Sequence, residues 1–90
     1  MSVKIYIASY LQPYTNNEAV VGVNGSKVGE CLSQVVKEFP GIEKMLYLET
    51  GKLLPYVAIY VNLADVYPED LAKSVKEGDE VHITYIISGG

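Results

Sequence analysis

The chain ends in Ser88, Gly89 and Gly90, and these are the residues whose types and spacing suggest a chemical role. Because glycine has no Cβ, a terminal glycine pair keeps the last peptide units extended, mobile and narrow. Such a tail can be threaded into the active site of another protein. The alternative is an ordinary frayed terminus, which needs no function. The elements that precede the glycine pair must decide between the two.

Other reactive side chains are few. Cys31 is the single cysteine, so it cannot form an internal disulfide, and it lies on or near the apolar stripe of a predicted helix, where a core thiol is expected. His82 is the single histidine and has no second ligand nearby in sequence, which favours a surface contact over a metal site. The sequence therefore predicts no metal and no bound cofactor, and a reducing cytoplasm is the expected location.

The composition fits one compact domain of 90 residues. The net charge is -4, and all seven basic residues are lysines, so the arginines typical of nucleic-acid readers are missing. We expect no nucleic-acid partner, and an acidic surface that serves solubility or a charge-complementary protein contact. No segment approaches the length of a membrane span, and no signal peptide is visible, so no membrane partner is expected.

The first half of the chain predicts a hairpin followed by a helix. Val3, Ile5 and Ile7 alternate with Lys4, Tyr6 and Ala8, as in a strand with one buried face. Residues 11–17 read as a loop, and residues 18–23 as a second strand antiparallel to the first. Ser26 is expected to cap a helix. Its apolar stripe is Val28, Leu32, Val35, Val36 and Phe39, and residues 40–41 end it.

The second half begins with residues 42–50, which fit either a short helix or an irregular connection. Residues 56–61 are the clearest strand, with Val57, Ile59 and Val61 facing inward. A turn at 62–65, a helical turn at 68–71 and a polar turn at 77–80 lead to a last strand, 81–87. The order predicts an α+β fold whose first and last strands are parallel neighbours, with the helix covering one face of the sheet.

The segment GKLLPYVAIYVN (residues 51–62), the segment KEGDEV (residues 76–81) and the terminal SGG occur in an order that resembles the ubiquitin-like β-grasp sulfur carriers. This family includes the small subunit of molybdopterin synthase, the thiamine and cysteine biosynthesis carriers and the archaeal small modifier proteins. The resemblance covers essentially the whole chain. It implies a β-grasp domain at residues 1–87, with a mixed sheet of four to five strands and one main helix, and a flexible diglycine tail at 88–90.

The resemblance also implies a chemistry for the tail. An adenylating activating enzyme would use ATP to join AMP to the carboxylate of Gly90, and a sulfur donor would displace AMP to leave a thiocarboxylate. Gly89 would give the tail the narrowness needed for threading. The chain would thus be a carrier and not an enzyme, with a large synthase subunit as a further partner and molybdopterin synthesis as the first expected destination.

Alternatives stay open at this point. They are thiamine or cysteine synthesis as the destination, a modifier joined through Gly90 to lysines of other proteins, and a β-grasp interaction module whose tail is idle.

Period-two alternation also predicts a contact surface beside the tail. If the strand at 56–61 neighbours the last strand, their outward side chains form an exposed apolar and aromatic patch of the kind that marks a protein contact. The bland alternative is that tyrosines merely suit strands. The predicted contact residues are Tyr56, Ala58, Tyr60, His82, Thr84 and Ile86.

Overall fold

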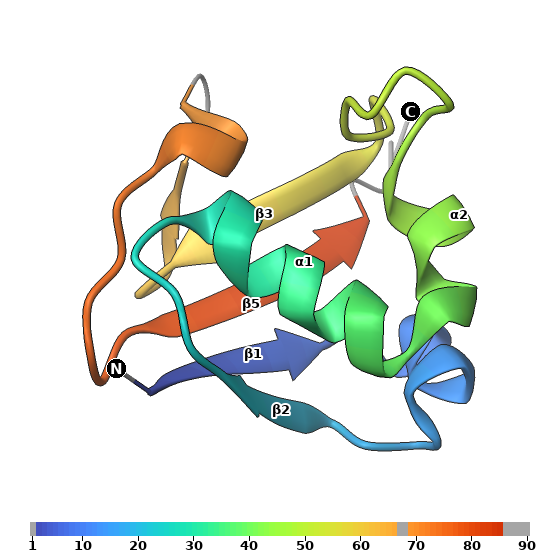
Figure 1. Ribbon diagram of the computed structural model, residues 1–90, viewed down its shortest axis with the longest axis horizontal. Coiled ribbons are helices and arrows are strands. Elements are labelled where there is room, and N and C mark those ends of the chain that lie inside the picture. The colour runs from blue at the N-terminus through green and yellow to red at the C-terminus, as the bar shows by residue number, and fades with distance from the viewer. Residues whose placement is uncertain (1, 67–68, 86–90) are drawn as a thin grey trace.

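The computed structural model describes residues 2–66 and 69–85, which form one mixed sheet with helices on one face (Figure 1). Its five strands lie in the order β2-β1-β5-β3-β4. The bounds are β1 (Val3–Ile7), β2 (Val20–Val23), β3 (Val57–Val61), β4 (Ala64–Asp65) and β5 (Glu80–Tyr85). This arrangement confirms the predicted α+β class and the sheet of four to five strands.

The first and last strands lie side by side at the centre of the sheet. β1 pairs with β5 in parallel, with Lys4 opposite Glu80 and Ile7 opposite Ile83, as the sequence predicted. β2 is antiparallel to β1 on one side, and β3 is antiparallel to β5 on the other. β5 therefore has a strand on each side and lies between the opening hairpin and the strand at 57–61 (Figure 1).

Helix α1 (Val28–Glu38) crosses the inner face of the sheet (Figure 1). Its buried residues Val28, Cys31, Leu32 and Val35 recur at spacings of three and four, which confirms the amphipathic stripe and the core thiol at Cys31. They pack against the inward side chains of the strands, among them Val57, Ile59 and Val61. The core thus lies between α1 and the sheet.

The prediction that Ser26 caps α1 is wrong. Lys27 holds the N-cap position and makes no side-chain cap. Glu30 instead reaches back and accepts hydrogen bonds from the Ser26 backbone N–H and hydroxyl, at 2.8 and 2.9 Å. These bonds lower the pKa of the Glu30 carboxyl. Glu30 therefore fixes the residue before the N-cap and does not cap the helix, and its negative charge suits the positive end of the helix dipole.

Gly29 in the first turn of α1 has a packing role that the sequence did not reveal. A Cβ placed there would lie 3.1 Å from the Leu71 carbonyl oxygen and 3.3 Å from the Leu71 Cβ. Leu71 belongs to a 3-10 turn, η3 (Asp70–Ala72), which agrees with the helical turn predicted at this point. Glycine therefore lets η3 pack closely on the start of α1.

The connections are more regular than expected. The predicted loop at 11–17 is mostly a 3-10 helix, η1 (Ser9–Thr15), because Leu11 is fully buried and draws the segment onto the core. Residues 42–50 contain a short helix, α2 (Glu43–Leu46), which follows another 3-10 turn, η2 (Pro40–Ile42). The short-helix alternative is therefore the one observed. No helix in the described part of the chain has the length and apolar character needed to cross a membrane.

Candidate functional site

The diglycine tail itself lies outside the described residues. Gly89, Gly90 and the predicted contact residue Ile86 fall in residues 86–90, and so does the predicted boundary between domain and tail. The structure does describe the surroundings of β5, the strand whose last residue, Tyr85, directly precedes them. Three features matter there: the junction of β3 with β5, the outer face of the sheet, and a group of tyrosines around Tyr85.

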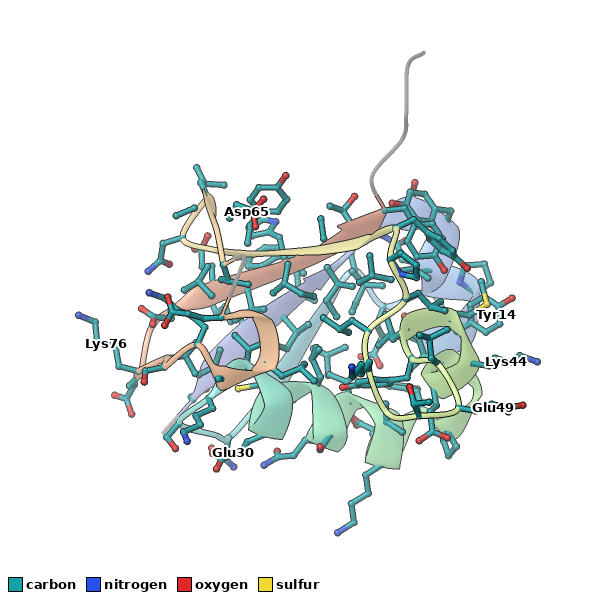
Figure 2. The ribbon with its side chains drawn as sticks, turned by 90° about the horizontal axis from the view of Figure 1, so that it is seen from above. Tyr14, Glu30, Lys44, Glu49, Asp65 and Lys76 are labelled. Atoms are coloured by element: carbon teal, nitrogen blue, oxygen red, sulfur yellow. The ribbon has the colours of Figure 1, made fainter. Side chains whose placement is uncertain are left out.

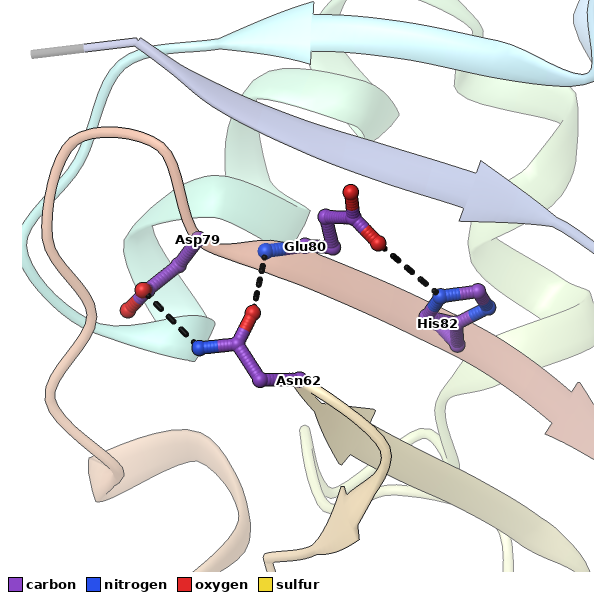
Figure 3. Close-up of polar contacts among 4 residues, drawn as sticks. All are labelled: Asn62, Asp79, Glu80 and His82. Carbon is purple, nitrogen blue, oxygen red and sulfur yellow. Dashed lines mark hydrogen bonds and ion pairs between the residues drawn. The ribbon is translucent and has the colours of Figure 1, made fainter.

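The side chain of Asn62 joins the end of β3 to the start of β5 (Figure 3). Its Nδ2 donates to Oδ1 of Asp79 at 3.0 Å, and its Oδ1 accepts the backbone N–H of Glu80 at 3.0 Å. The other Asp79 oxygen accepts the backbone N–H of Lys76 at 2.9 Å. One amide therefore ties together two strands and the turn before β5.

Backbone conformation explains why asparagine and glycine occupy these positions. Asn62 and Leu63 have φ of +50° and +71°, so the two-residue turn between β3 and β4 needs left-handed conformations at both central positions. Asparagine tolerates this conformation well, and leucine does not. Gly78, at φ +88°, makes the turn that brings Asp79 to Asn62. The segments that carried the family resemblance therefore build the frame of β5.

The Asn62 contact also acts on the charge of Asp79. The hydrogen bond from Asn62, followed by the one from the Lys76 backbone, lowers the pKa of the Asp79 carboxyl. Asp79 is almost completely buried, at 7% exposure, so its charge depends on these donors. The carboxylate thus stays ionised and keeps accepting both hydrogen bonds at neutral pH.

The outer face is the side of the sheet opposite α1. The strand register places Tyr60 opposite His82 and Ala58 opposite Thr84, while Tyr6 of β1 lies on the other side of His82. The rings of Tyr6 and His82 stack with centroids 4.5 Å apart and planes 6° apart. The outer face therefore includes Tyr6, Ala58, Tyr60, His82 and Thr84, with Lys4 and Glu80 at one end and the exposed Val20 and Gly22 of β2 along one side.

Most described residues of the predicted patch are at least partly exposed, and its role as a contact surface stays a prediction. Tyr56 is 47% exposed, and Tyr60, His82 and Thr84 are partly exposed. Ala58 is an exception, because it faces outward in the alternation but is only 7% exposed. Its single methyl group lies between Tyr56 and Tyr60 along the chain and opposite Thr84. We attribute its low solvent exposure to these larger neighbours. The prediction that Ala58 offers exposed contact surface is therefore wrong.

His82 is held from two sides at the middle of the outer face. Beyond the stack on Tyr6, its Nε2 lies 4.0 Å from Oε1 of Glu80, which is too long for a hydrogen bond (Figure 3). Within the part of the chain that the structure describes, this buried nitrogen has no hydrogen-bond partner. The described residues contain no group of three His, Cys, Asp or Glu side chains that could hold a metal ion. The contact role of His82 stays a prediction.

A group of tyrosines surrounds the last described residue of β5. The Tyr85 hydroxyl donates to the Met45 carbonyl of α2 at 2.9 Å. The Tyr85 ring packs against Tyr10 of η1, at a centroid distance of 4.7 Å, and meets Tyr56 edge-on at 5.1 Å. Burial, followed by the neighbouring tyrosines, raises the pKa of the Tyr85 phenol, so it remains a neutral donor. We call Tyr10, Tyr56 and Tyr85 the tyrosine cluster.

Figure 2 shows how the molecule separates these features. Tyr14 and Lys44, from η1 and α2, mark one end, and Asp65 and Lys76 mark the opposite end, near the Asn62 contact. The tyrosine cluster draws on η1 and bonds to α2, so it lies at the first end. β5 is therefore fixed at its start by Asn62 and at its last described residue by tyrosines.

Three aromatic residues of this region were missed from the sequence. Tyr6 was recognised as an outward residue, and the predicted parallel pairing of the first and last strands would have placed it beside His82. Tyr85 faces inward in the predicted last strand and was not considered as a site residue. Tyr10 carries no local signal, because it lies between the predicted first strand and the predicted loop at 11–17, in residues for which the sequence predicted no element.

Comparisons with known proteins identify relatives over the whole chain. The model of the ThiS family matches residues 5–90. A Mycobacterium tuberculosis protein named sulfur carrier protein CysO is 33% identical over 93 aligned residues that span 100% of both chains. Two solved structures are also similar to this chain. The first is the CysO chain of an Amycolatopsis orientalis BexX/CysO complex, at 32% identity, with a TM-score of 0.88 and coverage of 98% and 99%. The second comes from a Helicobacter pylori complex of molybdopterin-converting factor subunits 1 and 2, at 19% identity, with a TM-score of 0.65 and 100% coverage of both chains. The β-grasp fold expected from the sequence is thereby confirmed.

Proposed function

The chain belongs to the ThiS family, and from this premise we propose that it is a sulfur carrier that acts through the carboxylate of Gly90. In the first step, a carboxylate oxygen attacks the α-phosphorus of ATP in an activating enzyme and releases pyrophosphate. In the second, hydrosulfide from a sulfur donor attacks the acyl carbon, the bond from the acyl carbon to AMP breaks, and AMP leaves, so that a thiocarboxylate remains. The observation that carries this proposal is the whole-length similarity to relatives named sulfur carrier proteins.

The chemistry explains why a small chain can serve this role. A carboxylate is a poor acyl donor until one oxygen becomes part of a good leaving group, and joining it to AMP achieves that. The activating enzyme supplies ATP and the catalytic groups, so the carrier needs only a tail that reaches the enzyme and a surface that docks. Because the reaction consumes ATP, the cytoplasm is the compartment that we propose for it.

The outer face is the docking surface that we propose for the activating enzyme. Tyrosine is among the residues most enriched where interfaces carry their binding energy. Here Tyr60 and Tyr56 stand beside the strand that leads to the tail, and His82 lies between Tyr60 and Tyr6. The net charge of -4 favours a basic counterpart on the enzyme. The Amycolatopsis orientalis BexX/CysO complex, which contains a chain 32% identical to this one, is consistent with carriers that work by docking.

A substitution in the tail tests the carboxylate chemistry. Gly89→Val adds a branched side chain that should prevent threading, so adenylation by the host's activating enzyme should fall to background while thermal unfolding stays as in the wild type. Gly41→Val is the matched control, because Gly41 lies in η2 and not in the sheet, and a Cβ there would contact only the Tyr14 ring, at 3.9 Å. Intact mass should show sulfur in place of oxygen on the wild type. Normal adenylation of Gly89→Val would contradict the proposal.

The docking surface has its own test. Tyr60→Ala should raise the KM for the carrier about thirtyfold, because losing a central interface residue costs about 2 kcal/mol of binding free energy. Lys37→Ala, on the exposed side of α1, is the control. If both variants had the KM of the wild type, the outer face would not be the docking surface for the activating enzyme.

The destination of the sulfur is the finer part of the proposal. Molybdopterin synthesis, the first expectation from the sequence, has support only from likenesses such as that to the Helicobacter pylori structure, whose 19% identity speaks for the fold alone. The relatives named CysO are 33% identical along the full chain. We therefore propose that this carrier serves cysteine synthesis. Loss of sulfur from the thiocarboxylate should require the host's cysteine synthase, and loss to a large molybdopterin synthase subunit instead would reverse the assignment.

A protein modifier would use the same activated carboxylate but a different acceptor. In that case, Gly90 would be found in isopeptide bonds to lysines of other proteins, as ladders in cell extracts. Mass spectrometry of the carrier from cells distinguishes the two functions, since a sulfur carrier accumulates as the free thiocarboxylate.

A further inference from the structure

The last strand, β5, extends beyond the end of its parallel neighbour, β1. β1 ends at Ile7, opposite Ile83, whereas β5 continues to Tyr85. Thr84 and Tyr85 therefore have no strand beside them on the side of β1. A backbone donor in such a position must find another partner or be solvated by water.

The backbone N–H of Tyr85 points toward this open side. The Asn62 N–H donates to the Glu80 carbonyl, so these two residues form a hydrogen-bonded pair between β3 and β5. Hydrogen-bonded and non-hydrogen-bonded pairs alternate along an antiparallel ladder. Five residues further, Tyr85 pairs with Val57 at a non-hydrogen-bonded position, and its N–H is directed away from β3.

The Tyr10 hydroxyl occupies the place of the missing strand. It accepts the Tyr85 backbone N–H and shares a 2.9 Å hydrogen bond with the Thr84 hydroxyl. Tyr10 lies in η1, the element that follows β1. Its side chain therefore supplies the hydrogen-bond acceptor that a longer β1 backbone would have supplied to Tyr85. The Tyr10 ring also packs on the Tyr85 ring at 4.7 Å. Tyr85 is thus held through both its backbone and its side chain.

We propose that Tyr10 is a positioning residue for the reaction at Gly90, an inference that rests on the proposed function. Gly90 follows Tyr85 by only five residues. Fixing the backbone of Tyr85 sets the point and the direction from which the tail continues beyond the docked outer face. When the activating enzyme binds the outer face, the Gly90 carboxylate then has a high effective concentration at the enzyme's active site, because the fixed Tyr85 backbone limits the directions that the tail can take.

Tyr10→Phe tests the inference, since it keeps the ring contact and removes only the hydroxyl. Tyr14→Phe is the matched control, because Tyr14 lies in the same helix and its hydroxyl has no hydrogen-bond partner within residues 2–66 and 69–85. The assay is pyrophosphate release by the host's activating enzyme, chosen because it adenylates the wild type, with ATP fixed and carrier varied. Exchange of the Tyr85 amide hydrogen is measured in parallel by NMR.

We expect Tyr10→Phe to lower kcat about 3- to 10-fold, the range for losing the hydrogen bond that holds the Tyr85 backbone, and to leave the KM for the carrier unchanged, because the tyrosine and histidine side chains of the outer face stay in place. The Tyr85 amide should exchange faster in this variant, whereas Tyr14→Phe should match the wild type in all three quantities. A faster Tyr85 exchange with unchanged kcat would make Tyr10 purely structural and overturn the inference. A raised KM with unchanged kcat would also overturn it, since Tyr10 would then belong to the docking surface. If no activating enzyme adenylates the wild type, the proposed function falls, and this inference with it.

Discussion

Asn62 offers the sharpest test of how the frame of β5 is built. Its side chain makes two hydrogen bonds across the junction, to the Asp79 carboxylate and from the Glu80 N–H, and its backbone has φ of +50°. Two substitutions separate these contributions. Asn62→Gly removes both hydrogen bonds and permits the left-handed conformation, and Asn62→Ala removes the same bonds and strains the backbone as well.

The expected magnitudes follow from these contacts. A hydrogen bond to a charged group contributes about 1.5–3 kcal/mol and a neutral one about 0.5–1.5 kcal/mol. Because Asn62 is exposed and water can replace part of what is lost, the low end applies, and Asn62→Gly should cost about 2 kcal/mol. Alanine at positive φ should add about 1 kcal/mol more.

Urea denaturation followed by circular dichroism measures both free energies of unfolding, and in a domain of this size each kcal/mol lowers Tm by roughly 4–8 °C. Asn17→Gly is the control, because Asn17 also has positive φ, at +65°, and its side chain makes no hydrogen bond within the described residues. It should stay within about 0.5 kcal/mol of the wild type. The reasoning would be refuted if Asn62→Gly lowered the free energy of unfolding by less than about 0.5 kcal/mol. It would also be refuted if Asn62→Ala lowered it less than Asn62→Gly does.

Three further outcomes follow from the structure. Because the pKa of Asp79 is lowered below its usual 3.8, its stabilising charge is present above that pH and is lost as the pH falls through the lowered value, so the cost of Asn62→Gly should shrink in acid. Gly29→Ala should destabilise by about 1 kcal/mol in urea, despite alanine's better helix propensity, because its Cβ crowds Leu71. Leu63→Gly should stabilise by about 0.5–1 kcal/mol, since Leu63 is 79% exposed and has φ of +71°.

Each of these outcomes has a direct check. Titration of the Asp79 carboxyl by NMR should give a higher pKa in Asn62→Gly than in the wild type, and an equal pKa would contradict the coupling. Gly22→Ala, with open space around its Cβ, should be neutral or stabilising where Gly29→Ala is not. A destabilised Leu63→Gly would mean that the exposed leucine makes a contact worth more than its backbone strain.

Much of the fold could be predicted because local pattern and burial agree. Val3, Ile5 and Ile7 alternate in the sequence and are buried in β1, and the stripe of α1 recurs at helical spacing. The parallel pairing of the first and last strands also followed from the order of the elements. The turn residues Asn62 and Gly78 marked their own positions, because few other residues suit positive φ.

The remaining features could not be predicted because they depend on individual side-chain contacts, which produce no periodic pattern in the sequence. Ser26 looked like a cap, but Glu30 reaches back to it instead. Ala58 lies on the face where alternation put it, yet neighbouring side chains shade it. Tyr10 could not be assigned to the site, because its partner Tyr85 is almost at the other end of the chain and only the unequal lengths of β1 and β5 bring them together.

The pairing of β1 with β5 also has a consequence for folding kinetics. It joins the two ends of the described chain at the centre of the sheet, so it is a contact between residues far apart in the sequence and closes a loop of most of the described residues. Local contacts of the β1–β2 hairpin and α1 can form early, whereas such long-range closure is slow. During synthesis, β5 emerges after the four other strands of the sheet. The strand that leads to the tail is therefore inserted between finished neighbours, and a nascent chain cannot complete its sheet before the residues that precede the tail are available.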